Sequence, residues 1–127
     1  MQKLRIVIAD DSLPVREQLE QIFSQLEGFK VVGVAGDGAH AFWMVQVLNP
    51  DVLIMDLTLP RVSGLEVLQE IRKTNHSVVI IVLTTDPILI LRDACLKAGA
   101  NYYVNKAQVD HVVEICQRLI AGRRISA

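Results

Sequence analysis

Apolar residues occur along the chain in two alternating patterns. Short continuous runs rich in Val, Ile and Leu are typical of strands that are buried on both faces. Between these runs, apolar residues recur every three or four positions, which predicts helices with one face toward a core. The predicted strands span residues 4–9, 30–35, 52–55, 78–83 and 102–105.

Turn-forming and capping residues separate the predicted elements. Gly28, Asn49-Pro50 and Gly99 follow the ends of predicted helices, since glycine and proline do not continue a helix readily. The fourth helix is expected to begin at Asp86-Pro87, because an acidic N-cap followed by proline favours a helix start. The last helix carries an apolar stripe that begins at Val109.

Five strands, each followed by a helix, predict one α/β domain. Strands buried on both faces, with helices as connections, form a doubly wound parallel sheet with right-handed crossovers. A length of 127 residues suits a single compact domain, and 51% hydrophobic residues are enough for its core. We expect the domain to span residues 1–121, with 122–127 as a C-terminal tail or the start of a linker.

Charge and composition exclude several classes of partner and location. The formal net charge is −1, from 13 basic and 14 acidic residues, which gives no general attraction to nucleic acid or membranes. The first apolar run is short and ends at Asp10-Asp11, unlike a signal peptide. Cys95 and Cys116 match no metal or redox spacing and fit a reducing compartment. We therefore expect a cytoplasmic protein without direct contact to nucleic acid or membrane.

Polar side chains occur where four of the predicted strands end. They are Asp10, Asp11, Asp56, Thr84 and Lys106. An aspartate after a strand is usually a turn or helix cap, and a lone lysine is usually a solvated surface charge. The carboxyl ends of parallel strands meet at one edge of the sheet, however, and ligands bind there. The joint placement of these groups therefore predicts a functional site.

The chemistry of this set is self-consistent. Three carboxylates in one pocket repel one another and require a cation. Oxygen ligands without Cys or His suit Mg²⁺, or Mn²⁺ in its place, better than zinc. Such a metal and a lysine ammonium would neutralise an incoming phosphoryl group, and a carboxylate beside them can act as the nucleophile.

These residues resemble the response-regulator receiver family of two-component signalling, over about residues 3 to 121. The motifs that carry the resemblance are Asp10-Asp11, Asp56-Leu-Thr-Leu-Pro-Arg-Val-Ser-Gly64, Leu83-Thr84 and Gly99-Ala-Asn-Tyr-Tyr-Val-Asn-Lys106. The resemblance implies a chemotaxis-regulator-like fold with the flavodoxin-like strand order 2-1-3-4-5. It also implies a signalling switch rather than an enzyme, phosphorylated by a histidine kinase or a histidine phosphotransfer protein.

The resemblance further implies a role for each motif residue. Asp56 is the phosphoacceptor, and Asp10 and Asp11 hold Mg²⁺ together with Asp56 and the backbone carbonyl of Thr58. Lys106 forms an ion pair with the phosphoryl group. Thr84 bonds a phosphoryl oxygen, and Tyr103 turns inward when Thr84 moves.

Two positions depart from the family pattern. Ala107 follows Lys106 where a cis-linked proline is common, which leaves cis and trans geometry open at this bond. Thr85 follows Thr84 where a smaller residue is usual. We expect Thr58, Thr85 and Asp86 to modulate access to Asp56 and the reaction rates.

The resemblance places an output surface on the fourth helix and fifth strand. Leu89, Ile90 and Tyr103 are its expected residues, and Ile88, Leu91 and Cys95 are expected on the inward face of that helix. The downstream effector stays open, as does a phosphorylation-dependent homodimer.

Three readings of the function compete with a stand-alone phosphoacceptor. A flavin- or nucleotide-binding enzyme on this fold needs a phosphate-binding loop after the first strand, where Asp10 and Asp11 would repel phosphates. A receiver-like interaction module would not need Asp56, Thr84 and Lys106. The receiver of a longer transcriptional regulator stays open.

Overall fold

The computed structural model describes residues 2–85 and 89–126, which form five strands and five helices. The strands are β1 (Leu4–Ala9), β2 (Phe29–Ala35), β3 (Val52–Asp56), β4 (Val79–Thr84) and β5 (Tyr102–Asn105). The helices are α1 (Leu13–Ser24), α2 (Gly38–Leu48), α3 (Gly64–Thr74), α4 (Leu89–Lys97) and α5 (Val109–Ser126). The alternation of strand and helix predicted from the apolar pattern is confirmed.

All five strands are parallel and lie in the order β2-β1-β3-β4-β5. This confirms the doubly wound sheet and its expected order. The strand ends differ from the prediction, because the polar residues Asp56 and Thr84 belong to the ladder, opposite Leu83 and Asn105. The sheet therefore fixes the backbone of both residues.

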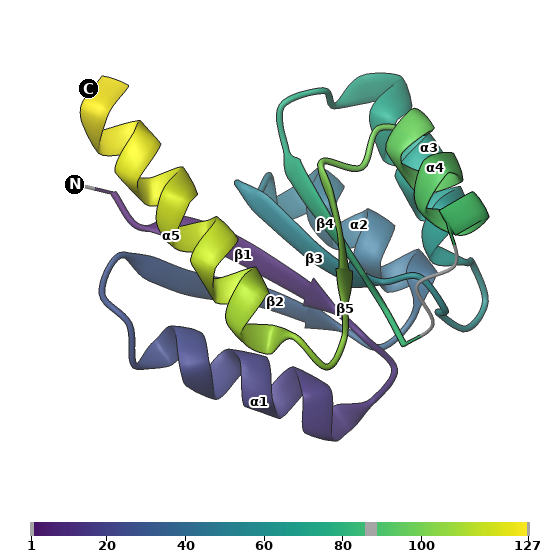
Figure 1. The fold of residues 1–127 in the computed structure, drawn as a ribbon. Coiled ribbons are helices and arrows are strands. Elements are labelled where there is room, and N and C mark those ends of the chain that lie inside the picture. Colours follow the sequence, from purple (N-terminus) through teal and green to yellow (C-terminus); the bar gives the residue numbers. More distant parts are fainter. Residues whose placement is uncertain (1, 86–88, 127) are drawn as a thin grey trace.

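Two apolar cores lie on the two faces of the sheet. Helices α1 and α5 cover one face, and α2, α3 and α4 cover the other (Figure 1). Phe23 of α1 and Ile115 of α5 are fully buried on the first side, and Leu68 and Ile71 of α3 on the second. No helix among the described residues is long and apolar enough to cross a membrane.

Some expectations at the level of single residues need correction. Leu91 was expected on the inward face of α4, but its side chain is 37% exposed, whereas Cys95 is buried as expected. Helix α5 continues through Ser126, so most of the expected tail is helical. The expected helix start at Asp86-Pro87 and the expected inward position of Ile88 lie outside the described residues.

Candidate functional site

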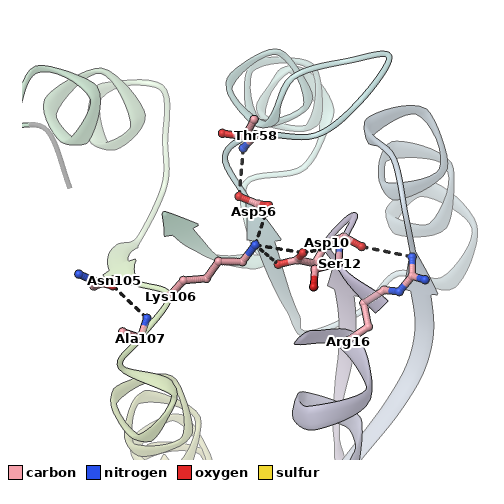
Figure 2. A network of polar contacts seen from close by, with 8 residues as sticks. All are labelled: Asp10, Ser12, Arg16, Asp56, Thr58, Asn105, Lys106 and Ala107. Carbon is pink, nitrogen blue, oxygen red and sulfur yellow. Dashed lines mark hydrogen bonds and ion pairs between the residues drawn. The ribbon is translucent and has the colours of Figure 1, made fainter. Parts of the chain in front are cut away.

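The carboxyl end of the sheet brings together three charged side chains from distant parts of the sequence (Figure 2). Asp10 follows β1, Asp56 ends β3, and Lys106 follows β5. The Lys106 Nζ atom lies 2.8 Å from Asp10 Oδ2 and 2.9 Å from Asp56 Oδ2. Asp10 is 0% and Asp56 5% exposed, so these ion pairs lie in a region poorly accessible to water.

The backbone of the β1–α1 turn fixes Asp10. Its amide donates to the carbonyl of Ala35, and its Oδ1 atom accepts a hydrogen bond from the amide of Ser12. Among the described residues, the buried Oδ2 atom of Asp10 has no hydrogen-bond partner, although Lys106 Nζ is close. A buried carboxylate oxygen is stabilised by nearby positive charge, which here comes from the Lys106 ammonium at 2.8 Å.

Asp56 is held at the end of β3 by its own turn. Its Oδ1 atom accepts a hydrogen bond from the Thr58 amide at 3.1 Å. Gly64 lets α3 begin close to this turn, because a Cβ atom there would lie 2.7 Å from the Asp56 carbonyl oxygen. Burial raises the pKa of Asp56, and the charge of Asp10 adds to this, while Lys106 and the Thr58 amide act in the opposite direction.

The β5–α5 turn positions Lys106. Its amide donates to the Thr84 carbonyl at 2.8 Å, and the amide of Ala107 donates to Asn105 Oδ1 at 2.9 Å. The Lys106–Ala107 peptide bond is trans. Burial alone would lower the pKa of Lys106, but its hydrogen bonds to Asp10 and Asp56 and their charges outweigh burial and raise the pKa.

The three aspartates form a possible metal site. Each of Asp10, Asp11 and Asp56 offers a carboxylate oxygen, and these oxygens lie within 4.8 Å of one another. The donors are all hard oxygens, Asp10 Oδ2 is buried without a hydrogen bond among the described residues, and Asp11 is exposed at the entrance. This set fits a hard divalent cation such as Mg²⁺.

The remaining predicted residues lie at different depths around the site. Thr84 is buried at the end of β4, and Thr58 and Thr85 are exposed. The Tyr103 ring packs against the core beneath α2, α3 and α4, and its hydroxyl is buried. Asp86 and the side chains of Leu89 and Ile90 lie outside the described part of the chain.

Two residues near the site were not predicted from the sequence. Arg16 of α1 reaches the Asp10 carbonyl with its Nη1 atom at 3.2 Å, and Asn105 accepts the Ala107 amide (Figure 2). No sequence pattern marked Arg16, because a guanidinium can donate to any backbone carbonyl within its reach. Asn105 sits beside a turn, where asparagine often bonds an amide two residues later.

Comparison with known families agrees with this geometry. The sequence model of the response regulator receiver domain matches residues 6–118. This chain belongs to that family. Family membership explains both the fold and the polar residues at the strand ends. The hypothesis of a flavin- or nucleotide-binding enzyme is therefore not pursued.

Receiver domains of several kinds of protein are similar to this one. Protein-glutamate methylesterase/protein-glutamine glutaminase 5 of Myxococcus xanthus (strain DK1622) is 37% identical over 128 residues, covering 98% of this chain and 37% of the relative. Response regulator MprA of Mycobacterium avium (strain 104) is 39% identical over 103 residues, covering 81% of this chain and 44% of the relative. The chain thus spans less than half the length of these relatives.

Solved structures show the same receiver fold. A LuxR-family two-component response regulator from Aurantimonas sp. SI85-9A1 superimposes with a TM-score of 0.87 at 30% identity, covering 95% of this chain and 87% of that one. The response regulator domain of Thermotoga maritima CheB superimposes with a TM-score of 0.84 at 27% identity, covering 92% and 96%. These similar structures belong to regulators with different names. The receiver fold alone therefore does not indicate which process this chain regulates.

Proposed function

We propose that this receiver accepts a phosphoryl group on Asp56 and acts as a Mg²⁺-dependent signalling switch. The observation that carries the proposal is the buried Asp56 carboxylate, which lies 2.9 Å from Lys106 Nζ and beside Asp10. A carboxylate oxygen of Asp56 attacks phosphorus, and the bond from phosphorus to the donor atom breaks as the new acyl phosphate forms. The chain would act as a regulatory module rather than as an enzyme.

The metal would be held by Asp10, Asp11 and Asp56, with the backbone carbonyl of Thr58 as a further ligand. The clustering of the three carboxylates and the buried oxygen of Asp10 support this assignment. Bound Mg²⁺, or Mn²⁺, supplies positive charge that neutralises phosphoryl oxygens. Asp11 lies at the exposed side, where it can bind the ion without closing the route to Asp56.

Lys106 and Thr84 would complete the phosphoryl site from the other side. The ammonium of Lys106 already contacts Asp56 and would form an ion pair with a phosphoryl oxygen attached there. Thr84 ends the neighbouring strand, and its hydroxyl would bond another oxygen once the Thr84 side chain moves toward Asp56. That movement would make room for the ring of Tyr103 and so shift a two-state equilibrium.

Residues at the rim would set the rates and the output. Thr58 and Thr85 are exposed beside the site and would control the approach of donor and water, together with Asp86. The output surface would include Tyr103 and the helix that carries Leu89 and Ile90. A charged or apolar effector, or a second phosphorylated copy, would bind there.

The donor would be a histidine kinase or a histidine phosphotransfer protein in the cytoplasm. Family membership supports this class of donor, and the buried, unpaired thiols of Cys95 and Cys116 fit a reducing compartment. The relatives named above are more than twice as long as the matched region, so a receiver within a longer transcriptional regulator is a second candidate.

Mass spectrometry of the intact protein tests the phosphoacceptor. With acetyl phosphate and Mg²⁺, the wild type should gain about 80 Da, the mass of one phosphoryl group. Asp56→Asn should show no gain, and neither should the wild type in excess EDTA. Stoichiometric labelling of the Asn variant, or equal labelling in EDTA, would contradict the proposal.

Thermal unfolding shows whether the Asp56→Asn protein is folded. Because its pKa is raised in the folded state, Asp56 contributes stability below pH 3.8 that is lost as pH rises through the folded-state pKa. At neutral pH the buried carboxylate therefore costs stability. The metal-free Asn variant should melt a few degrees above the wild type, so lost labelling would not reflect lost folding.

A further inference from the structure

The least constrained member of the aspartate cluster is Asp11. Its carboxylate lies within 4.8 Å of ligand oxygens of Asp10 and Asp56, yet Asp11 is exposed. Within residues 2–85 and 89–126, no hydrogen bond or ion pair holds this carboxylate. Its direction therefore depends on the backbone that carries it, and above all on the peptide group that joins Asp10 to Asp11.

Arg16 holds the carbonyl of that peptide group. Its Nη1 atom donates to the Asp10 oxygen at 3.2 Å, from the second turn of α1 (Figure 2). The Asp10 amide, on the other side of the residue, donates to Ala35 of β2. Both peptide groups that flank Asp10 are thus tied to other elements, which fixes the rotation of the Asp10–Asp11 peptide plane.

The β2–α2 turn is shaped to admit the Arg16 guanidinium. A Cβ atom built on Gly36 would lie 2.6 Å from Arg16 Nη1, closer than real Cβ atoms come to a nitrogen. Gly36 lies outside the left-handed region of backbone conformation, so no turn geometry requires glycine at this position. Because this nitrogen is the far end of a flexible side chain, a methyl group at position 36 would displace the Arg16 guanidinium from its present place.

We propose that Arg16 is a positioning residue for the metal site, which orients Asp11 by holding the Asp10 carbonyl, with Gly36 providing the space. This proposal rests on the proposed Mg²⁺ site. Partners that hold metal ligands in place typically contribute about 10- to 100-fold to metal affinity. Loss of the Arg16 contact should therefore weaken Mg²⁺ binding although Asp10, Asp11 and Asp56 are all present.

A purely electrostatic role for Arg16 predicts the opposite sign. Its guanidinium is a positive charge on the backbone carbonyl of Asp10, one of the three clustered aspartates, and it repels an incoming dication. If charge alone mattered, Arg16→Ala would bind Mg²⁺ more tightly. Gly36→Ala separates the two roles, because it displaces the guanidinium but keeps its charge.

Mg²⁺ titrations followed by amide NMR of five proteins test the proposal. Arg16→Ala and Gly36→Ala should each bind Mg²⁺ more weakly than the wild type, Arg16→Ala by about tenfold. Gly36→Ala should have little further effect in the Arg16→Ala background, since the side chain that it displaces is gone. Glu17→Gln, the next and exposed residue of α1, is the control and should stay within about twofold, because exposed charges interact weakly through water.

The metal-free spectra separate failure of this proposal from failure of the metal site. The Asp11 amide resonance should shift in both single variants without any Mg²⁺, because its peptide plane has turned. Equal or tighter Mg²⁺ binding by Arg16→Ala, or an unchanged Asp11 resonance, would overturn the role of Arg16. So would an equal effect of Gly36→Ala in both backgrounds. A wild type that does not bind Mg²⁺ would overturn the metal site and, with it, this role.

Discussion

Two polar networks, buried or half-buried, lie at opposite ends of the parallel strands. They differ in how their charges are matched. At the amino end of β4, the Arg72 guanidinium donates from Nε to the Gly99 carbonyl, from Nη1 to the Asn75 carbonyl and from Nη2 to Asn101 Oδ1. Asn101 Oδ1 also accepts the amide of Ile80. One cation here meets three neutral acceptors.

The network at the carboxyl end of the sheet is unbalanced. Three carboxylates, from Asp10, Asp11 and Asp56, lie close together, and within the described part of the chain the ammonium of Lys106 pairs with Asp10 and Asp56. One buried oxygen of Asp10 has no hydrogen bond among the described residues. A network of this kind is incomplete by itself, because like charges in a low-dielectric region repel and need a further cation.

The difference indicates how a structural network can be told from a functional one. In the Arg72 network each bond ties one loop to another, so its removal should cost stability and leave chemistry intact. In the aspartate network the excess negative charge costs stability and creates affinity for a cation. Its removal should therefore change chemistry first, as expected for Asp56→Asn.

Replacing Arg72 tests the structural side and should have the largest effect on stability. Arg72→Met keeps much of the apolar stem but removes three hydrogen bonds. At about 1 kcal/mol for each bond, the free energy of unfolding should fall by about 3 kcal/mol, measured by urea denaturation. Labelling by acetyl phosphate, per folded molecule, should match the wild type.

The neighbouring residue provides the control for this comparison. Lys73 is exposed and forms an ion pair with Glu70 at 2.8 Å. Exposed pairs contribute about 0 to 1 kcal/mol, so Lys73→Met should change stability little. A large loss of phosphorylation in folded Arg72→Met protein would show that the two networks are coupled. It would contradict the distinction between a structural network at Arg72 and a functional network at the aspartates.

Replacing Lys106 tests the aspartate network through the pH dependence of the free energy of unfolding. The Lys106→Met protein should be less stable than the wild type at neutral pH by about 2 kcal/mol, because Asp10 and Asp56 lose their counter-charge. The loss should stay below that of Arg72→Met, since the raised pKa of Asp56 lets it take up a proton. Added Mg²⁺ should reduce the difference in free energy of unfolding between the two proteins, because it replaces the missing positive charge.

The sign of the pH effect follows from the raised pKa of Lys106. A raised folded-state pKa gives stability that is fully present below pH 10.5 and is lost as pH rises through the folded value. The difference between wild type and Lys106→Met, measured by urea denaturation from pH 7 to 11, should therefore shrink above about pH 10.5. A difference that grows with pH would contradict the ion pairs with Asp10 and Asp56.

Local pattern was enough to predict the fold and the gathering of the strand-end side chains. The strands are apolar runs and the helices have apolar stripes, so their alternation predicts a parallel sheet. Parallel strands bring their carboxyl ends together, which is why Asp10, Asp56 and Lys106 could be grouped although they lie 46 to 96 residues apart. Family resemblance supplied the roles of these residues, which position alone does not give.

What could not be predicted depends on the reach of long side chains and on short elements. Arg16 and Arg72 contact backbone carbonyls, and any carbonyl in reach is an equivalent acceptor, so no sequence pattern marks the pair. Leu91 was assigned to the wrong face because the described part of α4 has 9 residues, too few for a distinct apolar stripe. The bounds of β3 and β4 were missed because Asp56 and Thr84 are polar yet continue the ladder.

The smallest predicted effect concerns Tyr103 of β5. Its ring packs against the core beneath α2, α3 and α4, and its hydroxyl is buried with no hydrogen-bond partner among the described residues. Burying a hydroxyl without a partner costs free energy, so Tyr103→Phe should raise the free energy of unfolding by up to about 1 kcal/mol. Labelling of Asp56 by acetyl phosphate should stay unchanged, because Tyr103 holds no metal or phosphoryl oxygen in the proposed mechanism.

Tyr102 is the matched control, because it is adjacent in β5 and 37% exposed. Its hydroxyl can be solvated, so Tyr102→Phe should leave stability unchanged within about 0.5 kcal/mol. Urea denaturation of both variants, with and without phosphorylation, makes the comparison sharper. If the Tyr103 hydroxyl gains a partner only after phosphorylation, Tyr103→Phe should be stabilising in the unphosphorylated protein and neutral or destabilising in the phosphorylated one. A loss of stability in the unphosphorylated Tyr103→Phe protein would show that the hydroxyl is already hydrogen-bonded. Tyr103 would then carry no unpaired buried hydroxyl.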